Sequence, residues 1–349
     1  MSEAPLSLAE LKTQVAAAGG APVEATLHVQ VLARTARTTR DQKPYFDFEL
    51  GDGGAHLRFK IWSNHPFHGA CASLEAGDFI EAEGEFAGHG TFGPEIRALR
   101  CRPLNADERE ELLLGSPERR ARLDLDYADI VRRVESIGDP RLRSVCKLFL
   151  ERFEGRFRRA AAARTYHHAR RGGLLEHVAQ MLRAADALCG VYAQLNRDLV
   201  IAGVLFHDCG KLWESCPTEQ GFAIERSETG ELLGHISIGF ELVNRLWSDL
   251  RENGTLTPWQ ALIPKSDLVR QHLLHLIASH HGEMQFGSPV VPKTPEAMLL
   301  HYVDNLDARL EMLAGAYANA PEIAPGIFEK VAPLAGPSVR PLPVWPAEP

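Results

Sequence analysis

Seven histidine and aspartate side chains in the second half of the sequence are of the types that bind transition metals. Each lies on or at the end of an apolar segment with helical periodicity, where an imidazole or a carboxylate is costly to bury without a partner. A single residue of this kind is more often a hydrogen-bonded core residue than a metal ligand. Seven of them, spread over four or five helices, are better explained by convergence on one centre. They are His177, His207, Asp208, His235, His280, His281 and Asp304.

The types of these side chains indicate the class of metal. Imidazole together with carboxylate suits Mn, Fe, Co, Ni or Zn, and the absence of thiolates argues against a structural zinc site. Seven groups are too many for one tetrahedral ion, so we expect two ions with Asp208 as the bridge between them. His207 and Asp208 follow the apolar stretch "VLF". Because neighbours on a helix diverge by about 100°, both reach one centre best where the helix ends, and we expect Gly210 to allow that turn.

Two metal ions a few ångströms apart can hold a bridging hydroxide and neutralise the oxygens of a phosphodiester. Asp208 and Lys211 are therefore the candidate catalytic residues. Lys211 has two interpretations that the sequence leaves open, a positive charge for the phosphate or an ordinary cation at a helix C-terminus. We interpret His272 and His275 as packing or supporting residues, and no spacing requires His167, His168 or His301 to lie at the site.

The N-terminal third of the chain has a different periodicity and predicts a small β-barrel. After a short helical segment over residues 1–21, five stretches over residues 22–104 alternate apolar and polar side chains, which is typical of an OB-fold. Glycine-rich turns are expected at "GDGG" (51–54) and "GHGTFG" (88–93). The apolar set expected to face inward is Leu27, Val29, Val31, Phe46, Phe48, Leu50, Leu57, Phe59 and Ile61.

The outward face of the central hairpin combines cations with aromatic rings. Single-stranded nucleic acid needs cations for its phosphates and rings on which its bases stack. The alternative is an ordinary solvated strand face with Trp62 covering one end of the barrel. An acidic stripe on another strand, Glu81, Glu83 and Glu85, leaves one side of the barrel for binding. The candidate nucleic-acid-binding residues of the hairpin are Tyr45, Arg58, Lys60 and Trp62.

Helical periodicity begins near Asp107 and continues to about Ala318. We expect a helical connector over residues 105–160, a helical bundle over residues 161–318 and a proline-rich tail over residues 319–349, extended, disordered or docked. Arginines are frequent from residue 152 to residue 171. A charge run is usually a solvated helix face, but this one leads into the histidine-rich region, so phosphate contact is the alternative. The candidates for that contact are Arg164, Arg170 and Arg171.

Composition sets limits on these interpretations. The 349-residue chain is 45% apolar and 24% charged with a net charge of −8, so any nucleic-acid contact must come from a local basic patch. We see no signal peptide and no run of 18 apolar residues, and therefore expect no membrane contact and a cytoplasmic location. The six scattered cysteines are expected to be reduced thiols. Assembly into a homo-oligomer stays open.

The order of the candidate residues along the chain resembles that of the HD-domain superfamily of metal-dependent phosphohydrolases. The H…HD…D pattern of that superfamily matches His177, His207, Asp208 and Asp304. The chain is also similar to the YhaM-type 3′→5′ exoribonucleases, which pair an N-terminal OB-fold with an all-α HD domain. The similarity extends over roughly residues 22–315. It is carried by "KPYFDFELGDGGAHLRFKIW", "HHARRGGLLEH", "LVIAGVLFHDCGK", "LLGHISIG" and "SHHGEMQFGSPVVPKTPEAMLLHYVDNLDAR".

The resemblance implies a ligand set and a substrate. One ion would be held by His177, His207, Asp208 and Asp304, and the other by Asp208, His235, His280 and His281. The family is Mn²⁺-dependent and acts on single-stranded RNA, and in some members on DNA. Cys209, where an aliphatic residue is more usual, and the proline-rich tail depart from the family pattern.

These observations favour a metal-dependent 3′→5′ exonuclease on single-stranded RNA, with single-stranded DNA as a further substrate. A phosphohydrolase of nucleotides or cyclic nucleotides is the first alternative, and the predicted OB-fold argues against it because a nucleotidase has no need of that domain. A non-catalytic RNA-binding regulator is the second alternative, and the complete ligand set argues against it.

Overall fold

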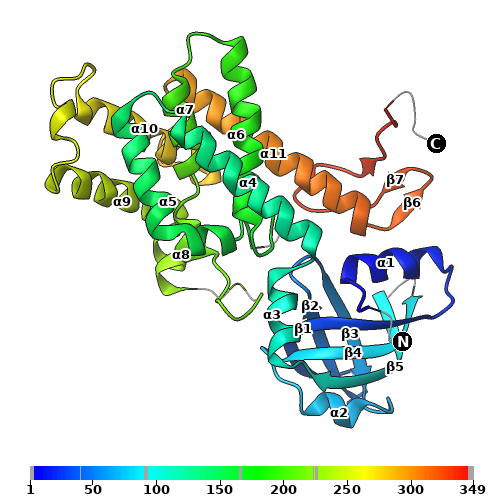
Figure 1. Ribbon diagram of the computed structural model, residues 1–349. Coiled ribbons are helices and arrows are strands. Elements are labelled where there is room, and N and C mark those ends of the chain that lie inside the picture. The colour runs from blue at the N-terminus through cyan, green and yellow to red at the C-terminus, as the bar shows by residue number, and fades with distance from the viewer. Residues whose placement is uncertain are drawn as a thin grey trace. The chain divides into compact units, whose positions relative to one another are not determined.

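The computed structural model describes residues 4–344 except residues 40, 90–92, 165, 166, 223, 225 and 226. The chain forms two compact units, the first made of Met1–Asp124 with Pro217–Glu225 and the second of Leu125–Cys216 with Arg226–Pro349. Each unit is shown in Figure 1. The elements of the first unit are α1 (Leu8–Ala17), β1 (Val23–Thr38), β2 (Pro44–Gly51), β3 (His56–Trp62), α2 (His68–Ala72), β4 (Phe79–His89), β5 (Gly93–Pro103) and α3 (Ala106–Leu114).

Helix α4 (Pro117–Glu135) runs from the first unit into the second. The second unit is mainly helical and ends in three very short strands. Its further elements are α5 (Pro140–Arg159), α6 (Gly173–Val191), α7 (Arg197–Phe206), α8 (Lys211–Glu214), α9 (Glu228–Glu252), η1 (Thr257–Trp259), α10 (Ser266–Ser279), η2 (Met284–Phe286), α11 (Pro295–Asn319), β6 (Glu322–Ala324), β7 (Ile327–Phe328) and β8 (Ser338–Val339).

The first unit has the strand order of an OB-fold. Its antiparallel sheet runs β3-β2-β1-β4-β5, with α2 between β3 and β4. The apolar residues predicted to face inward are buried, except Phe46, which is half-buried. In the part of the chain that the structure describes, β3 and β5 lie close together without forming a ladder, so the sheet is open along these edges. The OB-like fold predicted from the alternating strands is therefore confirmed.

The "GDGG" hairpin turn forms as predicted, and it also anchors the N-terminal helix. Asp52 Oδ1 accepts hydrogen bonds from the backbone amides of Gly54 (2.9 Å) and Ala55 (2.8 Å). Its other oxygen accepts from the amide of Leu8 at 2.7 Å, in the first turn of α1. The centre of the second predicted turn, residues 90–92, lies outside the described residues.

The second unit is a bundle of α5, α6, α7, α9, α10 and α11 (Figure 1). Helix α7 is central to it, because every residue from Leu199 to Phe206 is buried. Asn196 caps the helix by accepting a hydrogen bond from the amide of Leu199. The helix ends at Phe206 with His207 as its C-cap, as the sequence predicted.

Gly210 has a different role from the one expected. Its dihedral angles are helical (φ −65°, ψ −20°), so it does not supply a left-handed turn. A Cβ atom there would lie 1.9 Å from the backbone oxygen of His235 in α9. Gly210 is therefore needed because two backbones approach closely, which a sequence pattern cannot distinguish from a turn.

Helix α9 is kinked at Gly234, whose φ of 66° and ψ of 160° interrupt the helical conformation just before His235. After α11, the tail forms the strands β6–β8 rather than a wholly extended segment. The ring of Tyr317 packs against Phe328, and its hydroxyl donates to the backbone oxygen of Val339 (3.0 Å), which attaches the tail to α11. No helix in the described part of the chain combines the length and apolar character needed to cross a membrane.

Candidate metal centre

The bundle brings the seven predicted ligands together from five places in the chain. Helix α6 carries His177, the α7–α8 corner carries His207 and Asp208, and the residue after the α9 kink is His235. His280 and His281 follow α10, and Asp304 lies on α11. Helical periodicity could predict each of these helices, but only the packing of the bundle makes their polar residues neighbours.

Asp208 lies at the centre of the cluster, and its two oxygens face different histidines. Oδ2 is 3.3 Å from His207 Nε2 and 4.0 Å from His177 Nε2. Oδ1 is 3.4 Å from His235 Nε2 and 3.6 Å from His280 Nε2. The carboxylate thus separates the histidines into two groups.

Each group is compact enough to hold an ion. Donor atoms of His177, His207 and Asp208 lie within 4.8 Å of one another, and so do those of His235, His280 and His281. Asp304 joins the first group, because its Oδ1 is 3.3 Å from His177 Nε2. We name these the His177 group (His177, His207, Asp304) and the His235 group (His235, His280, His281), with Asp208 shared.

Most of the inward-facing donor atoms have no hydrogen-bond partner among the described residues. A buried polar atom without a partner costs about 1–3 kcal/mol. Several such atoms in one place fit a bound cation, which would accept the lone pair of each. The atoms are Nε2 of His177, His207, His235 and His280, and Oδ1 of Asp208.

The outward nitrogens of the histidines are all occupied, which fixes which nitrogen can bind metal. An Nδ1–H that donates to an acceptor leaves a lone pair on Nε2. Two of the five acceptors are carboxylates and three are backbone carbonyls. They are Asp307 for His177 (2.7 Å), Glu214 for His235 (3.0 Å), Val204 for His207 (2.7 Å), Ile277 for His280 (2.8 Å) and Phe286 for His281 (2.7 Å).

Burial and charge produce opposite pKa shifts at His177 and at the three histidines of the His235 group. Burial lowers the pKa of His281 to about 4 and also lowers the pKa of His235 and His280, so these rings are neutral at pH 7, the form in which an imidazole can bind a metal. Burial alone would lower the pKa of His177 too, but the neighbouring carboxylates of Asp304 and Asp307 raise it to about 9. Nearby carboxylates thus favour a positive charge at His177, and a metal cation can supply that charge.

Lys211 lies against the shared carboxylate. Its ammonium is 2.7 Å from Asp208 Oδ2 and donates to the backbone oxygen of Ala162, and the side chain is buried. Burial opposes ionisation of Asp208, but Lys211 and His207 hold the pKa of that carboxyl well below its usual range. Of the two interpretations left open, these contacts favour a charge within the site over a solvated cation at a helix end.

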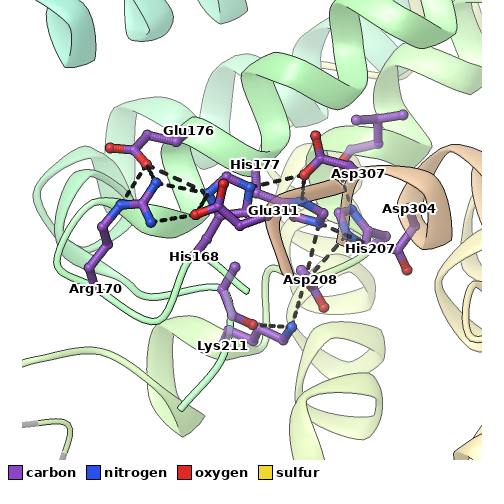
Figure 2. Close-up of polar contacts among 12 residues, drawn as sticks. His168, Arg170, Glu176, His177, His207, Asp208, Lys211, Asp304, Asp307 and Glu311 are labelled. Carbon is purple, nitrogen blue, oxygen red and sulfur yellow. Dashed lines mark hydrogen bonds and ion pairs between the residues drawn. The ribbon is translucent and has the colours of Figure 1, made fainter. Parts of the chain in front are cut away.

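A second layer of polar residues surrounds His177 (Figure 2). The sequence singled out Arg170 of this layer, for a different role, but not Asp307, Glu176 or Glu311. Asp307 contacts both His177 and His168, and Arg170 donates to Glu176 (2.9 Å from Nε) and pairs with Glu311. The only available signal was that Asp307 lies three residues after Asp304, on the same side of α11.

The candidate nucleic-acid contacts differ in how much of their charge is already paired. The rings of Tyr45 and Trp62 pack at 4.8 Å, and Lys60 Nζ is 5.6 Å from the Tyr45 ring. Arg58 is exposed but forms a 2.7 Å ion pair with Glu49, its cross-strand neighbour.

The arginines before the cluster are also engaged within the protein. Arg164 pairs with Glu231 and donates to the backbone oxygen of Glu214, and Arg170 has the two carboxylate partners described above. Arg171 is half-buried. The binding roles of all these residues stay predictions.

Comparison with known proteins agrees with the fold and the cluster. A family model described as HD domain matches residues 174–309, which implies binding of divalent metal ions by donors of the kind clustered here. A curated protein of Geobacillus sp., "3′-5′ exoribonuclease YhaM", is 30% identical over 289 residues, covering 82% of each chain. Proteins with the same name in Bacillus subtilis and Shouchella clausii are each 29% identical, covering 82% and 87% of this chain and 85% and 88% of their own.

Proposed function

The chain belongs to the YhaM family of 3′-5′ exoribonucleases, and we propose that it removes nucleotides from the 3′ end of single-stranded RNA. We further propose that it uses two divalent transition-metal ions, Mn²⁺ being the expected metal and Fe, Co, Ni and Zn the alternatives. Single-stranded DNA as a second substrate, assembly into a homo-oligomer and a cytoplasmic location are parts of the same proposal. The six free cysteines support that location.

The observation that carries this proposal is the position of Asp208 between two groups of donor atoms. His177, His207 and Asp304 would hold one ion, His235, His280 and His281 the other, and Asp208 both. Ions bound there would supply Lewis-acid chemistry and a nucleophilic water at neutral pH. Within the chain, the Nδ1 hydrogen bonds keep each Nε2 lone pair directed inward, and Lys211 contributes a buried positive charge 2.7 Å from Asp208.

We assign RNA binding to residues 22–104 and catalysis to residues 161–318. On the sheet face, Tyr45 and Trp62 offer rings for stacking, and Lys60 offers a cation for a phosphate. Arg58, Arg164 and Arg170 contribute less than their charge suggests, because each already has a carboxylate partner. Arg171 is a further predicted phosphate contact.

The test uses a 5′-labelled single-stranded RNA with the full-length, Mn²⁺-loaded protein. We expect a ladder of products that shorten one nucleotide at a time from the 3′ end. A folded, metal-loaded sample that leaves the RNA intact contradicts the proposal. Faster release of phosphate from a mononucleotide than of nucleotides from the oligomer favours a nucleotide phosphohydrolase instead.

A further inference from the structure

The five ligand histidines differ in the group that holds their outer nitrogen. His207, His280 and His281 donate to neutral backbone carbonyls, whereas His177 and His235 face carboxylates. His177 Nδ1 is 2.7 Å from Asp307 Oδ2, and His235 Nδ1 is 3.0 Å from Glu214 Oε2. Each of the two ligand groups therefore contains one carboxylate-supported histidine.

We infer that Asp307 and Glu214 are positioning residues that control the two ions separately. Asp307 governs the ion of the His177 group, and Glu214 governs the ion of the His235 group. The inference rests on the two-ion arrangement proposed above. A carboxylate fixes the proton on Nδ1 and orients the ring more strongly than a neutral carbonyl does, and it makes Nε2 a better donor.

Asp307 is held rigidly by a layer of polar residues, of which His168 and Glu176 are buried (Figure 2). The same oxygen that faces His177 is 3.0 Å from Nε2 of His168, which is fully buried and has a positive φ of 47°. The backbone of His168 is fixed in turn by Gly173, where a Cβ atom would lie 2.0 Å from the His168 oxygen. Asp307 cannot turn away from His177 without disturbing this packing.

The outer part of this layer consists of ion pairs. Arg170 lies between Glu176 and Glu311, and Glu176 Oε2 is 3.6 Å from His168 Nδ1. Arg170, a predicted phosphate contact, is thus placed where it supports His168 and through it Asp307. The chain from Arg170 to His177 links the segment before α6 to α11.

Glu214 is supported in a different way. It ends the short helix α8, three residues after Lys211, and its backbone oxygen accepts from Arg164. Its Cα would lie 3.1 Å from a Cβ atom at Gly230, so the start of α9 packs closely on its backbone. Its side chain remains 20% exposed, and among the described residues no second histidine contacts it as His168 contacts Asp307. We therefore expect the larger effect from the more rigid carboxylate, Asp307.

The test measures Mn²⁺ affinity without RNA, so it does not depend on nuclease activity. Asp307→Asn and Glu214→Gln keep the side-chain shapes, and each is placed in two backgrounds. His235→Ala weakens binding of the ion in the His235 group, so that the ion of the His177 group can be titrated alone. His177→Ala does the reverse. In the His235→Ala background we expect Asp307→Asn to weaken Mn²⁺ binding about 10–100-fold and Glu214→Gln to leave it unchanged. In the His177→Ala background Glu214→Gln should weaken Mn²⁺ binding, by a smaller factor than Asp307→Asn does in the first background, and Asp307→Asn should leave it unchanged.

Glu228→Gln is the matched control, because Glu228 is an exposed carboxylate in the first turn of α9. Equal effects of the two variants in both backgrounds, or no effect in either, overturn the inference. If a background binds no Mn²⁺, bound ions are counted at limiting free Mn²⁺ in the chain with all seven ligands. Each single variant should then hold one ion where the unsubstituted chain holds two.

Retention of both ions by both variants overturns the inference. An unsubstituted chain that binds fewer than two ions contradicts the proposed function instead, so the two failures can be told apart.

Discussion

The metal cluster and the outward face of the β2–β3 hairpin place polar side chains in opposite environments. In the cluster, buried nitrogens and one carboxylate oxygen point inward without hydrogen-bond partners among the described residues. On the hairpin, Arg58 is 76% and Trp62 41% exposed, and neighbouring side chains of the same sheet already contact them. The cluster has donor atoms that a bound ligand would satisfy, whereas the side chains of the hairpin face already contact one another. One substitution in the cluster should therefore abolish metal binding and RNA degradation almost completely. One substitution on the hairpin should reduce RNA affinity only in part.

The largest effect is expected at the shared ligand. Asp208→Ala removes the one carboxylate that faces both histidine groups, so we expect loss of bound metal and a fall in RNA degradation on the order of 10⁴-fold or more. RNA affinity, measured by filter binding, should change little, because the residues proposed to bind RNA do not include Asp208. If a folded Asp208→Ala protein degrades RNA as fast as the unsubstituted chain, the cluster is not the more sensitive of the two regions and this comparison is wrong.

Gly210→Ala tests whether the cluster depends on backbone packing. The new Cβ would meet the His235 backbone oxygen at 1.9 Å, so α9 must move. We expect a loss of about 1–3 kcal/mol in the free energy of unfolding, together with weaker Mn²⁺ binding. Gly190→Ala is the control, since nothing lies within 4 Å of its added Cβ near the end of α6. Chemical denaturation with and without Mn²⁺ measures the free energy of unfolding and the stabilisation by the metal. Equal stability of the Gly210→Ala and Gly190→Ala variants would refute the packing role.

Stacking on the hairpin should give an intermediate effect. Tyr45→Ala or Trp62→Ala is expected to weaken single-stranded RNA binding by about 1–3 kcal/mol, with Mn²⁺ content unchanged. Because the two rings pack at 4.8 Å, the double variant should lose less than the sum of the single variants. Unaltered affinity in the double variant, measured by fluorescence anisotropy, would show that RNA does not use this face.

The smallest effects are expected from the cations of the same face. Lys60→Ala should reduce the slope of log RNA affinity against log salt concentration by about 0.7, which is the value for one lost phosphate contact. Arg58→Ala should change it less, because Glu49 already pairs with that guanidinium at 2.7 Å. Titrations over a range of salt concentrations compare the two variants, and a larger effect at Arg58 would contradict this ranking.

The sequence predicted local structure well, because local patterns determine it. Alternation gave the buried face of the sheet, and apolar periodicity gave α7 and its end before His207. The types of seven side chains indicated a metal cluster before any of their distances could be known. Gly210 was misinterpreted because a glycine needed for close backbone packing looks the same in sequence as one needed for a turn.

The partners of these residues could not be predicted in the same way. Asp307 lies 130 residues from His177, and Glu311 lies 141 residues from Arg170, so no spacing rule connects them. The pairing of Arg164 with Glu231, 67 residues away, is equally invisible in the sequence. Tertiary packing decides which arginines remain available to a phosphate and which histidines receive a carboxylate.

Elemental analysis of the purified, Mn²⁺-equilibrated protein tests the central claim most directly. Two groups of donors that share Asp208 predict about two ions per chain, and less than one ion per chain for Asp208→Ala. A single ion in the unsubstituted protein, or two ions that survive the loss of Asp208, would contradict the account.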